Sequence, residues 1–471
     1  MKSIAISIGK VKQSMRMDGS YHNADINVYD DILQGHSSHC LDFYCSNIYT
    51  TGRGRRVYTR PDYGVPFLSN SDMTAQDPLM SCNYMSRKYG YDEPSLLKGG
   101  MILTGRVGAI GQTAFVPKYW EKYSMMGSDN IIRIVVKEHY KNGFIYAYLA
   151  SKYGNLLFWK HATGGVQPFI TDKMVAELPI PDLSIAFQQE IDDLIQESAR
   201  LREEATDMLH QAKKLLKEKA SLEDLVPEDY DYYGHRAADR KVSCFSIKRK
   251  DITTTTINAF NLSERIRKTK EKIQSHYVSL GDVIENGRTF SSTSSSSVEV
   301  SPNNGVMFVN QKDIFDNIIK GKWVSKRGFN PANCIQLGEV LVACDGTLGE
   351  SEFFCHALYA GEELSGKLIS SHFMRMRGNG TIPMGYLFAW LDTDYGFRFI
   401  RNTQAGTKLC HPIQKLFVEI PVPLIDNDSM QEIDRLVREA HTKRYKANCK
   451  ERKAISMVEE EIESWTTSKK N

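Results

Sequence analysis

The sequence predicts an α+β protein in which two mixed α/β domains are each followed by a long helix, and the two helices pair as an antiparallel coiled coil. Three observations support this: the halves of the chain repeat one another, a Pro-x-Pro element closes the globular part of each half, and a helical seam follows each Pro-x-Pro. The expected segments are a first domain, a helix, a linker, a second domain and a second helix, over residues 1–182, 183–225, 226–240, 241–424 and 425–471.

The internal repeat is the main signal. Four stretches of the first half match four stretches of the second half in the same order, at a shift that varies only from 238 to 242 residues. The matching pairs are 64–67 with 305–308, 100–111 with 338–349, 177–181 with 419–423, and 189–192 with 431–434. Because four collinear matches are hard to obtain by chance, we expect two copies of one structural unit.

A glycine-rich turn follows an apolar, strand-like stretch in each half. The apolar stretches are 101–103 and 340–342, and the turns that follow contain several glycines, which permit positive φ and close approach of another backbone or a ligand. Two interpretations stay open: a tight hairpin in the core, or a loop that faces DNA.

The Pro-x-Pro elements at 179–181 and 421–423 force extended backbone and prevent a helix from continuing through them, so each marks the end of a globular domain. A seam with alternating steps of three and four residues then begins, as in a coiled coil. Its first copy comprises Ile191, Leu194, Ser198, Leu201, Ala205, Met208, Ala212 and Leu215. Its second copy comprises Ile433, Leu436, Ala440, Lys443, Ala447, Lys450, Ala454 and Met457.

Two stretches are expected to be irregular. Pro227 and Gly234 break the first helix, so the residues around them form the linker between the halves. The serine-rich stretch 291–297 has no counterpart in the first half and is expected to be a surface loop.

No catalytic motif is present in the sequence. Asn330-Pro-Ala-Asn333 lacks the second proline and the aromatic residue of an amino-methyltransferase motif, and 361–368 resembles a phosphate-binding loop but ends in leucine instead of Ser/Thr. The twelve histidines show no metal-ligand spacing. The sequence therefore predicts a chain without an active site.

The repeated strings resemble a known family. Gly105-Arg-Val-Gly-Ala-Ile-Gly111, Cys344-Asp-Gly-Thr-Leu-Gly349, Ala162-Thr-Gly-Gly-Val-Gln167 and the opening Arg16-Met-Asp-Gly-Ser-Tyr21, together with Pro-x-Pro and Gln-Glu-Ile in both halves, are similar to the specificity subunit of type I restriction-modification systems. The resemblance covers nearly the whole chain. The second half departs from it at 405–409, where the glutamine is missing, and at 258–261, which only weakly echoes residues 16–19.

The resemblance implies that each globular unit is a target recognition domain that reads one half of a bipartite site in double-stranded DNA. It implies that the helices pair antiparallel as spacers and dock modification (methyltransferase) subunits, and that an ATP-driven restriction and translocation subunit joins them. S-adenosylmethionine, ATP and Mg²⁺ would then be bound by those partner subunits, and none by this chain. The repeated parts would hold the architecture, and the divergent parts would read two different half-sites.

The candidate DNA-binding residues are basic side chains, which would contact phosphates, and polar loop side chains, which would read bases. The net charge is only +3, so the local distribution of charge matters more than its sum. The candidates are Arg53, Arg55, Arg56, Arg106, Thr163 and Gln167 in the first half, and Lys322, Lys326, Arg327 and Lys408 in the second half.

Two other functions stay open at this point. One is a stand-alone enzyme that modifies or cleaves DNA with an unrecognised active site, and the other is a coiled-coil scaffold that does not contact DNA. Purified protein that methylates or cuts DNA unaided would favour the first, and a chain that protects no DNA in a footprint would favour the second.

Overall fold

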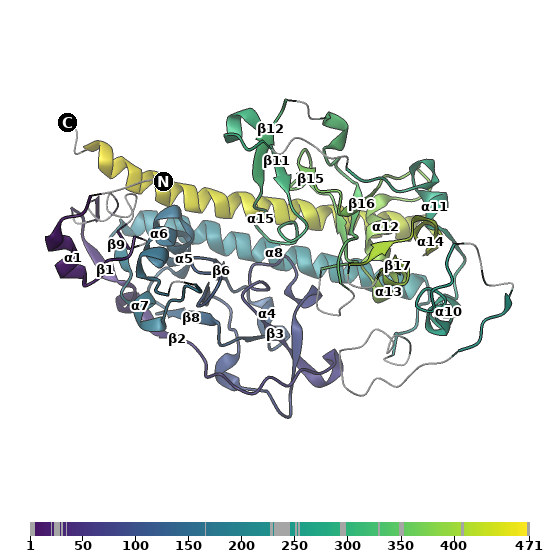
Figure 1. Cartoon of the computed structure of the whole chain (residues 1–471), viewed down its shortest axis with the longest axis horizontal. Helices are drawn as coiled ribbons and strands as arrows, with labels where there is room; N and C mark the ends of the chain where they lie inside the picture. Colours follow the sequence, from purple (N-terminus) through teal and green to yellow (C-terminus); the bar gives the residue numbers. More distant parts are fainter. Residues whose placement is uncertain are drawn as a thin grey trace. The chain divides into compact units, whose positions relative to one another are not determined.

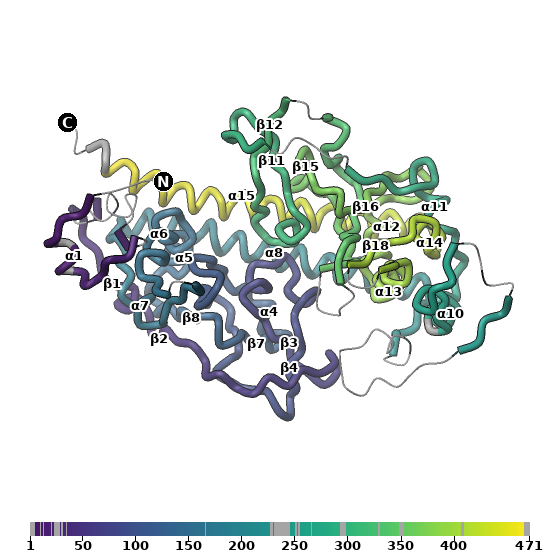
Figure 2. Tube along the Cα trace, viewed as in Figure 1, coloured from purple at the N-terminus to yellow at the C-terminus, as the bar shows by residue number. Residues whose placement is uncertain are grey.

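The computed structural model describes residues 5–19, 21–22, 29, 32–33, 35–164, 166–226, 229, 245–249, 252, 255–292, 298–327, 330–347, 353–406 and 409–468. Most of the predicted linker, part of the serine-rich loop and Lys408 lie outside these residues. The chain forms two compact units, one of residues 1–203 with 446–471, the other of residues 204–445. Figure 2 traces the chain through both units, and each is described by itself below.

The first unit contains a four-stranded antiparallel sheet in the order β2-β8-β5-β6 and a three-stranded mixed sheet in the order β4-β3-β7. Figure 1 labels most of the elements. The strands are β1 (Ser38–Cys40), β2 (Cys45–Tyr49), β3 (Gly64–Leu68), β4 (Asn83–Ser86), β5 (Ile102–Gly105), β6 (Thr113–Phe115), β7 (Met126–Gly127), β8 (Ile131–Val136) and β9 (Pro179–Pro181). The short helices are α1 (Ile8–Ser14), α3 (Leu41–Tyr44), α4 (Tyr119–Lys122), α5 (Asn142–Ala150), α6 (Lys152–His161) and α7 (Asp172–Ala176).

The second unit has sheets in the orders β14-β13-β16 and β12-β11-β15, and two strand pairs, β10-β19 and β17-β18. The strands are β10 (Tyr277–Ser279), β11 (Gly305–Val309), β12 (Lys322–Ser325), β13 (Val340–Ala343), β14 (Ala357–Tyr359), β15 (Leu368–Ile369), β16 (Phe373–Met376), β17 (Gln404–Ala405), β18 (His411–Pro412) and β19 (Pro421–Pro423). The short helices are α10 (Glu264–Glu271), α11 (Leu280–Val283), α12 (Met384–Leu391), α13 (Asp394–Asn402) and α14 (Gln414–Val418).

Both Pro-x-Pro elements are strands, as their restricted backbone requires. β9 pairs antiparallel with β1, and β19 pairs antiparallel with β10, so each closes its unit onto a strand near its beginning. In both units a strand that precedes the glycine turn is fully buried, β5 in the first and β13 in the second. The apolar residues that predicted these strands therefore supply the centre of each sheet.

The long helices are α8 (Ile185–Lys219) and α15 (Asn427–Ser468). Each begins at a polar cap: the Ser184 hydroxyl accepts a hydrogen bond from Phe187 N at 3.3 Å, and Asp426 Oδ1 accepts one from Ser429 N at 2.8 Å. The hydrogen bonds from Ser429 lower the pKa of Asp426. No helix in the described part of the chain is long and apolar enough to cross a membrane.

The helix seam of α8 differs from its prediction at three positions. The residues Ile191, Ser198, Leu201, Ala205 and Ala212 are buried as the heptad requires. The prediction was wrong for Leu194, Met208 and Leu215, which are only partly buried, while Ile195, Leu209 and Leu216 are buried instead. Because the helix also packs against the globular part of its unit, its buried stripe is wider than a two-position seam.

Parts of α8 and α15 contact each other inside each unit. In the first unit, Ser198 Oγ donates a hydrogen bond to the Ala447 carbonyl at 2.9 Å, and Arg202 forms an ion pair with Glu451 at 2.5 Å. In the second unit, two ion pairs place later residues of α8 opposite earlier residues of α15: Lys443 with Glu204 at 2.6 Å, and Lys219 with Asp426 at 3.7 Å.

The same hydrogen bond ties the globular part of each unit to its long helix. In the first unit, Asp192 Oδ1 of α8 accepts a hydrogen bond from Gly143 N at the start of α5, at 2.7 Å. In the second, Asp434 Oδ1 of α15 accepts one from Gly385 N at the start of α12, at 2.8 Å. Each aspartate thus satisfies a free N–H at the first turn of a helix packed against its own.

Candidate nucleic-acid interface

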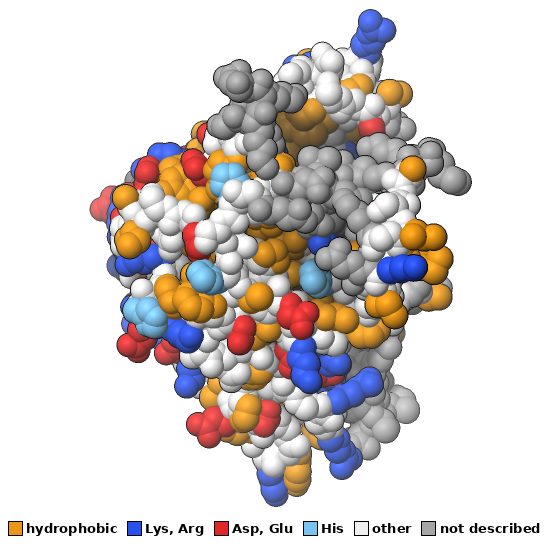
Figure 3. Space-filling view, turned by 90° about the vertical axis from the view of Figure 1, so that its left-hand side faces the viewer, with side chains coloured by type: hydrophobic (Ala, Val, Ile, Leu, Met, Phe, Trp, Pro, Cys, Tyr) orange, Lys and Arg blue, Asp and Glu red, His pale blue; other side chains and the backbone are white. Residues whose placement is uncertain are grey.

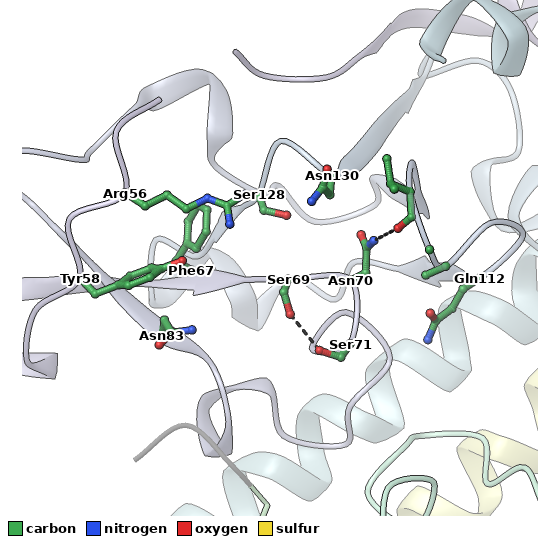
Figure 4. Close-up of a pocket in the computed structure, with 13 residues that line it drawn as sticks. Arg56, Tyr58, Phe67, Ser69, Asn70, Ser71, Asn83, Gln112, Ser128 and Asn130 are labelled. Carbon is green, nitrogen blue, oxygen red and sulfur yellow. Dashed lines mark hydrogen bonds between the residues drawn. The ribbon is translucent and has the colours of Figure 1, made fainter. Parts of the chain in front are cut away.

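The first unit contains a pocket of about 390 Å³ between the mixed sheet and the glycine turn. Its walls come from the segment before β3, from β3 and the loop after it, from the start of β4, from the turn after β5 and from the loop before β8 (Figure 4). The lining residues are Arg56, Tyr58, Phe67, Ser69, Asn70, Ser71, Asn83, Val107, Gly108, Ala109, Gln112, Ser128 and Asn130.

Three hydrogen bonds hold the loops of this pocket together. Asn70 Nδ2 donates to the Val107 carbonyl at 2.8 Å, and Arg106 N donates to the Asn130 carbonyl at 2.8 Å. Ser128 N donates to the Leu68 carbonyl at 2.9 Å. Gly108 has a φ of +76° in the turn, a backbone conformation that favours glycine. The repeated glycine turn therefore joins the hairpin of β5 and β6 and is also one wall of the pocket, and its facing DNA stays a prediction.

Two buried polar atoms of the pocket have no hydrogen-bond partner among the described residues. They are Asn70 Oδ1 and Ser128 Oγ, and the Ser128 residue is only 3% exposed. A buried polar atom without a partner costs about 1–3 kcal/mol, which a bound polar ligand would recover. These atoms therefore point to a ligand with hydrogen-bonding groups of its own.

The predicted Arg56 lines the pocket, but its charge is compensated. Its guanidinium forms an ion pair with Asp129 and lies 5.7 Å from the centroid of the Phe67 ring. The hydrogen bond with Asp129 raises the pKa of Arg56. The other polar groups of the lining are the amides of Asn70, Asn83, Gln112 and Asn130 and the hydroxyls of Tyr58, Ser69, Ser71 and Ser128.

The other predicted residues of the first unit lie on neighbouring segments. Thr163 forms two backbone hydrogen bonds with Phe169, at 2.9 and 2.8 Å, and Ile170 N donates to the Arg106 carbonyl at 2.9 Å. The structure thus brings Arg106 next to the loop that carries Thr163 and the exposed Gln167. Arg53 and Arg55 are exposed on the segment that leads to Arg56.

The hydrogen bonds that join the turn after β5 to the loops after β3 and before β8 form a loop junction. The second unit repeats this loop junction with different side chains. Gln311 Nε2 donates to the Asp345 carbonyl at 2.9 Å, and Cys344 N donates to the His372 carbonyl at 3.0 Å. These bonds match those of Asn70 with Val107 and of Arg106 with Asn130 at the shifts of the sequence repeat. Gln311 Oε1 and Ser370 Oγ are buried without a partner among the described residues, as are the matching Asn70 Oδ1 and Ser128 Oγ.

A His-Asp-His cluster occupies this junction in the second unit. Nδ1 of His411 lies 2.6 Å from Oδ1 of Asp345, and Nδ1 of His372 hydrogen-bonds the other carboxylate oxygen. Burial would raise the pKa of Asp345, but the hydrogen bonds from the two imidazoles outweigh burial and lower it. Both imidazoles are about half exposed, at 54% and 57%, so their second nitrogens are accessible.

Three predicted residues of the second unit, Lys322, Lys326 and Arg327, lie at and beyond β12. Lys322 is opposite Phe308 in the strand register, the position that Asn83 takes opposite Phe67 in the first unit, and it forms an ion pair with Glu299 at 2.5 Å. The hydrogen bond with Glu299 raises the pKa of Lys322. Lys326 and Arg327 are exposed at the end of β12 and in the turn after it.

Sequence reasoning missed the amides of the first unit and the histidine cluster of the second. Extending the repeat alignment would pair Asn70 with Gln311 and Asn130 with His372. That pairing of polar residues outside the matched stretches was the available signal. That these residues lie together in the structure depends on the sheet register.

Charges of both signs are interspersed on the described part of the face in Figure 3, in keeping with the small net charge. Among the described residues no group of three or more His, Cys, Asp or Glu side chains is arranged to hold a metal ion. The three side chains of the His-Asp-His cluster are joined by hydrogen bonds.

No protein-family model and no curated protein sequence matches the chain. Several solved structures match it over almost its whole length. The S subunit of a type I restriction-modification system from M. genitalium is 13% identical, with a TM-score of 0.32 over 92% of this chain and 93% of that one. The HsdS subunit from Thermoanaerobacter tengcongensis is 13% identical, with a TM-score of 0.28 over 92% and 96%.

A third solved structure, the type IIG restriction endonuclease BpuSI, is 8% identical, with a TM-score of 0.29 over 39% of this chain and 29% of that one. The chain is thus similar along nearly its whole length to the S subunits of type I restriction-modification systems.

Proposed function

We propose that this chain is the non-catalytic DNA-specificity subunit of a type I restriction-modification complex, and that each unit reads one half of a bipartite target. One observation carries the proposal: the same loop junction, with the same two unpaired polar positions, recurs in both units while the side chains around it differ. A shared junction with divergent polar groups fits two readers of different sequences.

The chemistry at the two junctions suits base recognition. Amides, imidazoles and hydroxyls present hydrogen-bond donors and acceptors to base edges, whereas arginines and lysines bind phosphates without reading sequence. The exposed Arg53, Arg55, Lys326 and Arg327 would supply phosphate contacts, with Arg106, Thr163 and Gln167 beside the first junction. Lys408 is assigned to the same role from sequence alone.

The two long helices would act as a spacer. Their contacts within each unit support an antiparallel coiled coil, and at 1.5 Å per residue the 35 residues of α8 extend over about 52 Å. That length exceeds one turn of DNA, which is about 34 Å. The helices would also dock the methyltransferase subunits and a restriction subunit, which would carry S-adenosylmethionine, ATP and Mg²⁺.

The test is methylome sequencing of cells that express the partner subunits with and without this chain. A bipartite methylation motif that requires the chain supports the proposal, and an unchanged methylome contradicts it. DNA cleavage or methylation by the purified chain alone would instead indicate a stand-alone enzyme. A footprint of the assembled complex that is identical without this chain would indicate a scaffold.

A deletion tests the spacer role. Removing about one heptad from both long helices at matched positions is expected to shorten the tolerated gap between the half-sites and leave both half-site sequences unchanged. Altered half-site sequences with an unchanged gap would contradict the spacer assignment.

A further inference from the structure

We propose that the pocket of the first unit reads the major-groove edge of an adenine in an A·T pair, with the amides of Asn130 and Asn70 as the reading groups. This inference rests on the proposed function and names the target chemistry of one of its two readers. It begins from the polar groups that the pocket leaves available.

Asn70 and Ser128 define what a ligand must supply. The Asn70 amide nitrogen donates one of its two N–H groups to the Val107 carbonyl, and its buried oxygen, which has no partner among the described residues, is left to accept a hydrogen bond from a ligand. The Ser128 hydroxyl, also buried, can donate or accept. In Figure 4 Asn130 lies on the same wall as Ser128, and its carbonyl is fixed by Arg106 N at 2.8 Å. The pocket thus offers an amide acceptor and an amide with both donor and acceptor.

Adenine matches this set of groups. In the major groove it presents the N7 acceptor and the N6 amino donor, the pair that asparagine and glutamine side chains read. The N6 amino group would donate to an amide oxygen, and N7 would accept from the Asn130 amide nitrogen.

Guanine fits the pocket less well. It presents two acceptors, O6 and N7, which are read by a cationic fork of donors from arginine or lysine. Arg56 is the cationic side chain of the lining, and its guanidinium is paired with Asp129. The Gln112 amide nitrogen donates to Thr74 at 2.8 Å.

The aromatic wall suits the other base of the pair. Tyr58 and Phe67 line the pocket with ring centroids 6.2 Å apart. Apolar side chains contact the thymine methyl group, which no other DNA base carries. Amides and an aromatic surface together therefore favour an A·T pair.

The experiment is methylome sequencing with the full complex carrying Asn130→Ala, compared with the wild type and with His372→Ala. In the Asn130→Ala complex one adenine position of one half-site is expected to become degenerate, with a tenfold to hundredfold loss of discrimination. The base preferences of the other half-site should not change. His372→Ala is the matched variant of the second unit, and it should alter only the other half-site.

A second variant keeps the side-chain size. Asn130→Asp removes the donor, and it is expected to shift the preference at the same position toward cytosine, whose N4 amino group donates to carboxylates. In binding assays with duplexes, replacing the adenine by 7-deazaadenine should weaken the wild type about tenfold and leave Asn130→Ala unaffected.

The two proposals fail in different ways. If the wild-type complex gives no bipartite motif, the proposed function itself fails. The adenine assignment is overturned if the motif is present and Asn130→Ala leaves the base preferences of both half-sites unchanged. It is also overturned if the variant loses the preference at a G·C position. Asn304→Ala, at an exposed asparagine of the second unit, controls for general loss of complex and should leave the motif unchanged.

Discussion

The two units hold a buried arginine at matching positions, but they compensate its charge differently. Arg133 in the first unit donates to backbone carbonyls, including Ile131 O at 2.8 Å, and burial lowers its pKa to about 10. Arg375 in the second unit forms an ion pair with Glu339 at 2.7 Å, with both side chains 1% exposed. At the repeat shift, Met101 occupies the position of Glu339. The two units share the backbone arrangement around this arginine, but they differ in the groups that compensate its charge.

The largest expected difference between the units is at these arginines. Arg375→Met leaves Glu339 buried with Arg377 as its remaining cation, so we expect a loss of about 3–5 kcal/mol in the stability of the second unit. Arg133→Met removes a donor from backbone carbonyls and leaves no buried charge, so we expect a loss of about 1–3 kcal/mol in the stability of the first unit. Amide hydrogen exchange in β16 and β8 measures the two effects separately. Adding Glu339→Met should recover most of the loss from Arg375→Met, and equal losses in the two single variants would contradict the comparison.

The second expected difference is in pH dependence. His441 in α15 is partly buried against the rings of Tyr359 and Phe388 in the second unit. Desolvation and then the charge of Arg444 lower its pKa to about 3, whereas the repeat shift places Ala199 at the matching position of the first unit. Because an unfolded histidine titrates near pH 6.5, the unfolded state binds the extra proton between about pH 6.5 and 3. The second unit should therefore lose up to about 1.4 kcal/mol for each pH unit below 6.5.

The measurement is urea denaturation across this pH range, followed by hydrogen exchange in each unit. His441→Ala, which installs the residue of the first unit, should remove this contribution while lowering stability at neutral pH through lost packing. A His441→Ala variant with the same acid sensitivity as the wild type would show that other groups cause it.

The smallest expected effect should be equal in the two units. Asp192→Ala and Asp434→Ala each remove the acceptor for the first N–H groups of a packed helix, at Gly143 and Gly385. Each variant is expected to lower the stability of its unit by about 0.5–2 kcal/mol, as the loss of a helix cap does. Amide hydrogen exchange at the starts of α5 and α12 measures this loss of stability. A loss in only one unit would show that the two hydrogen bonds do not contribute equally.

Much of the fold follows from local pattern. The Pro-x-Pro elements, the apolar strands before the glycine turns and the two long helices were predicted because proline, β-branched residues and helical periodicity act over a few residues. The shifted seam at Ile195, Leu209 and Leu216 was not, because it depends on packing against the globular parts.

The candidate site was less predictable. Arg56 was selected for its charge, yet that charge is paired, and the pocket is made of amides at 70, 83, 112 and 130. Those residues meet because β3 pairs with both β4 and β7 and the glycine turn folds beside them. Which residues come together in this way depends on the sheet register, and the register cannot be predicted from any one stretch of sequence.

The first unit is built from two separate stretches of the chain, residues 1–203 and 446–471. Ala454, Val458 and Ile462 of α15 are buried in its core, and Glu451 accepts a hydrogen bond from Tyr146 at 2.7 Å. The half that leaves the ribosome first therefore has to wait until α15 is made before its core is complete. A premature stop after residue 445 would leave the second unit with all of its residues and deprive the first of part of its interior. Synthesis of α15 thus becomes a condition for completing the earlier-made unit.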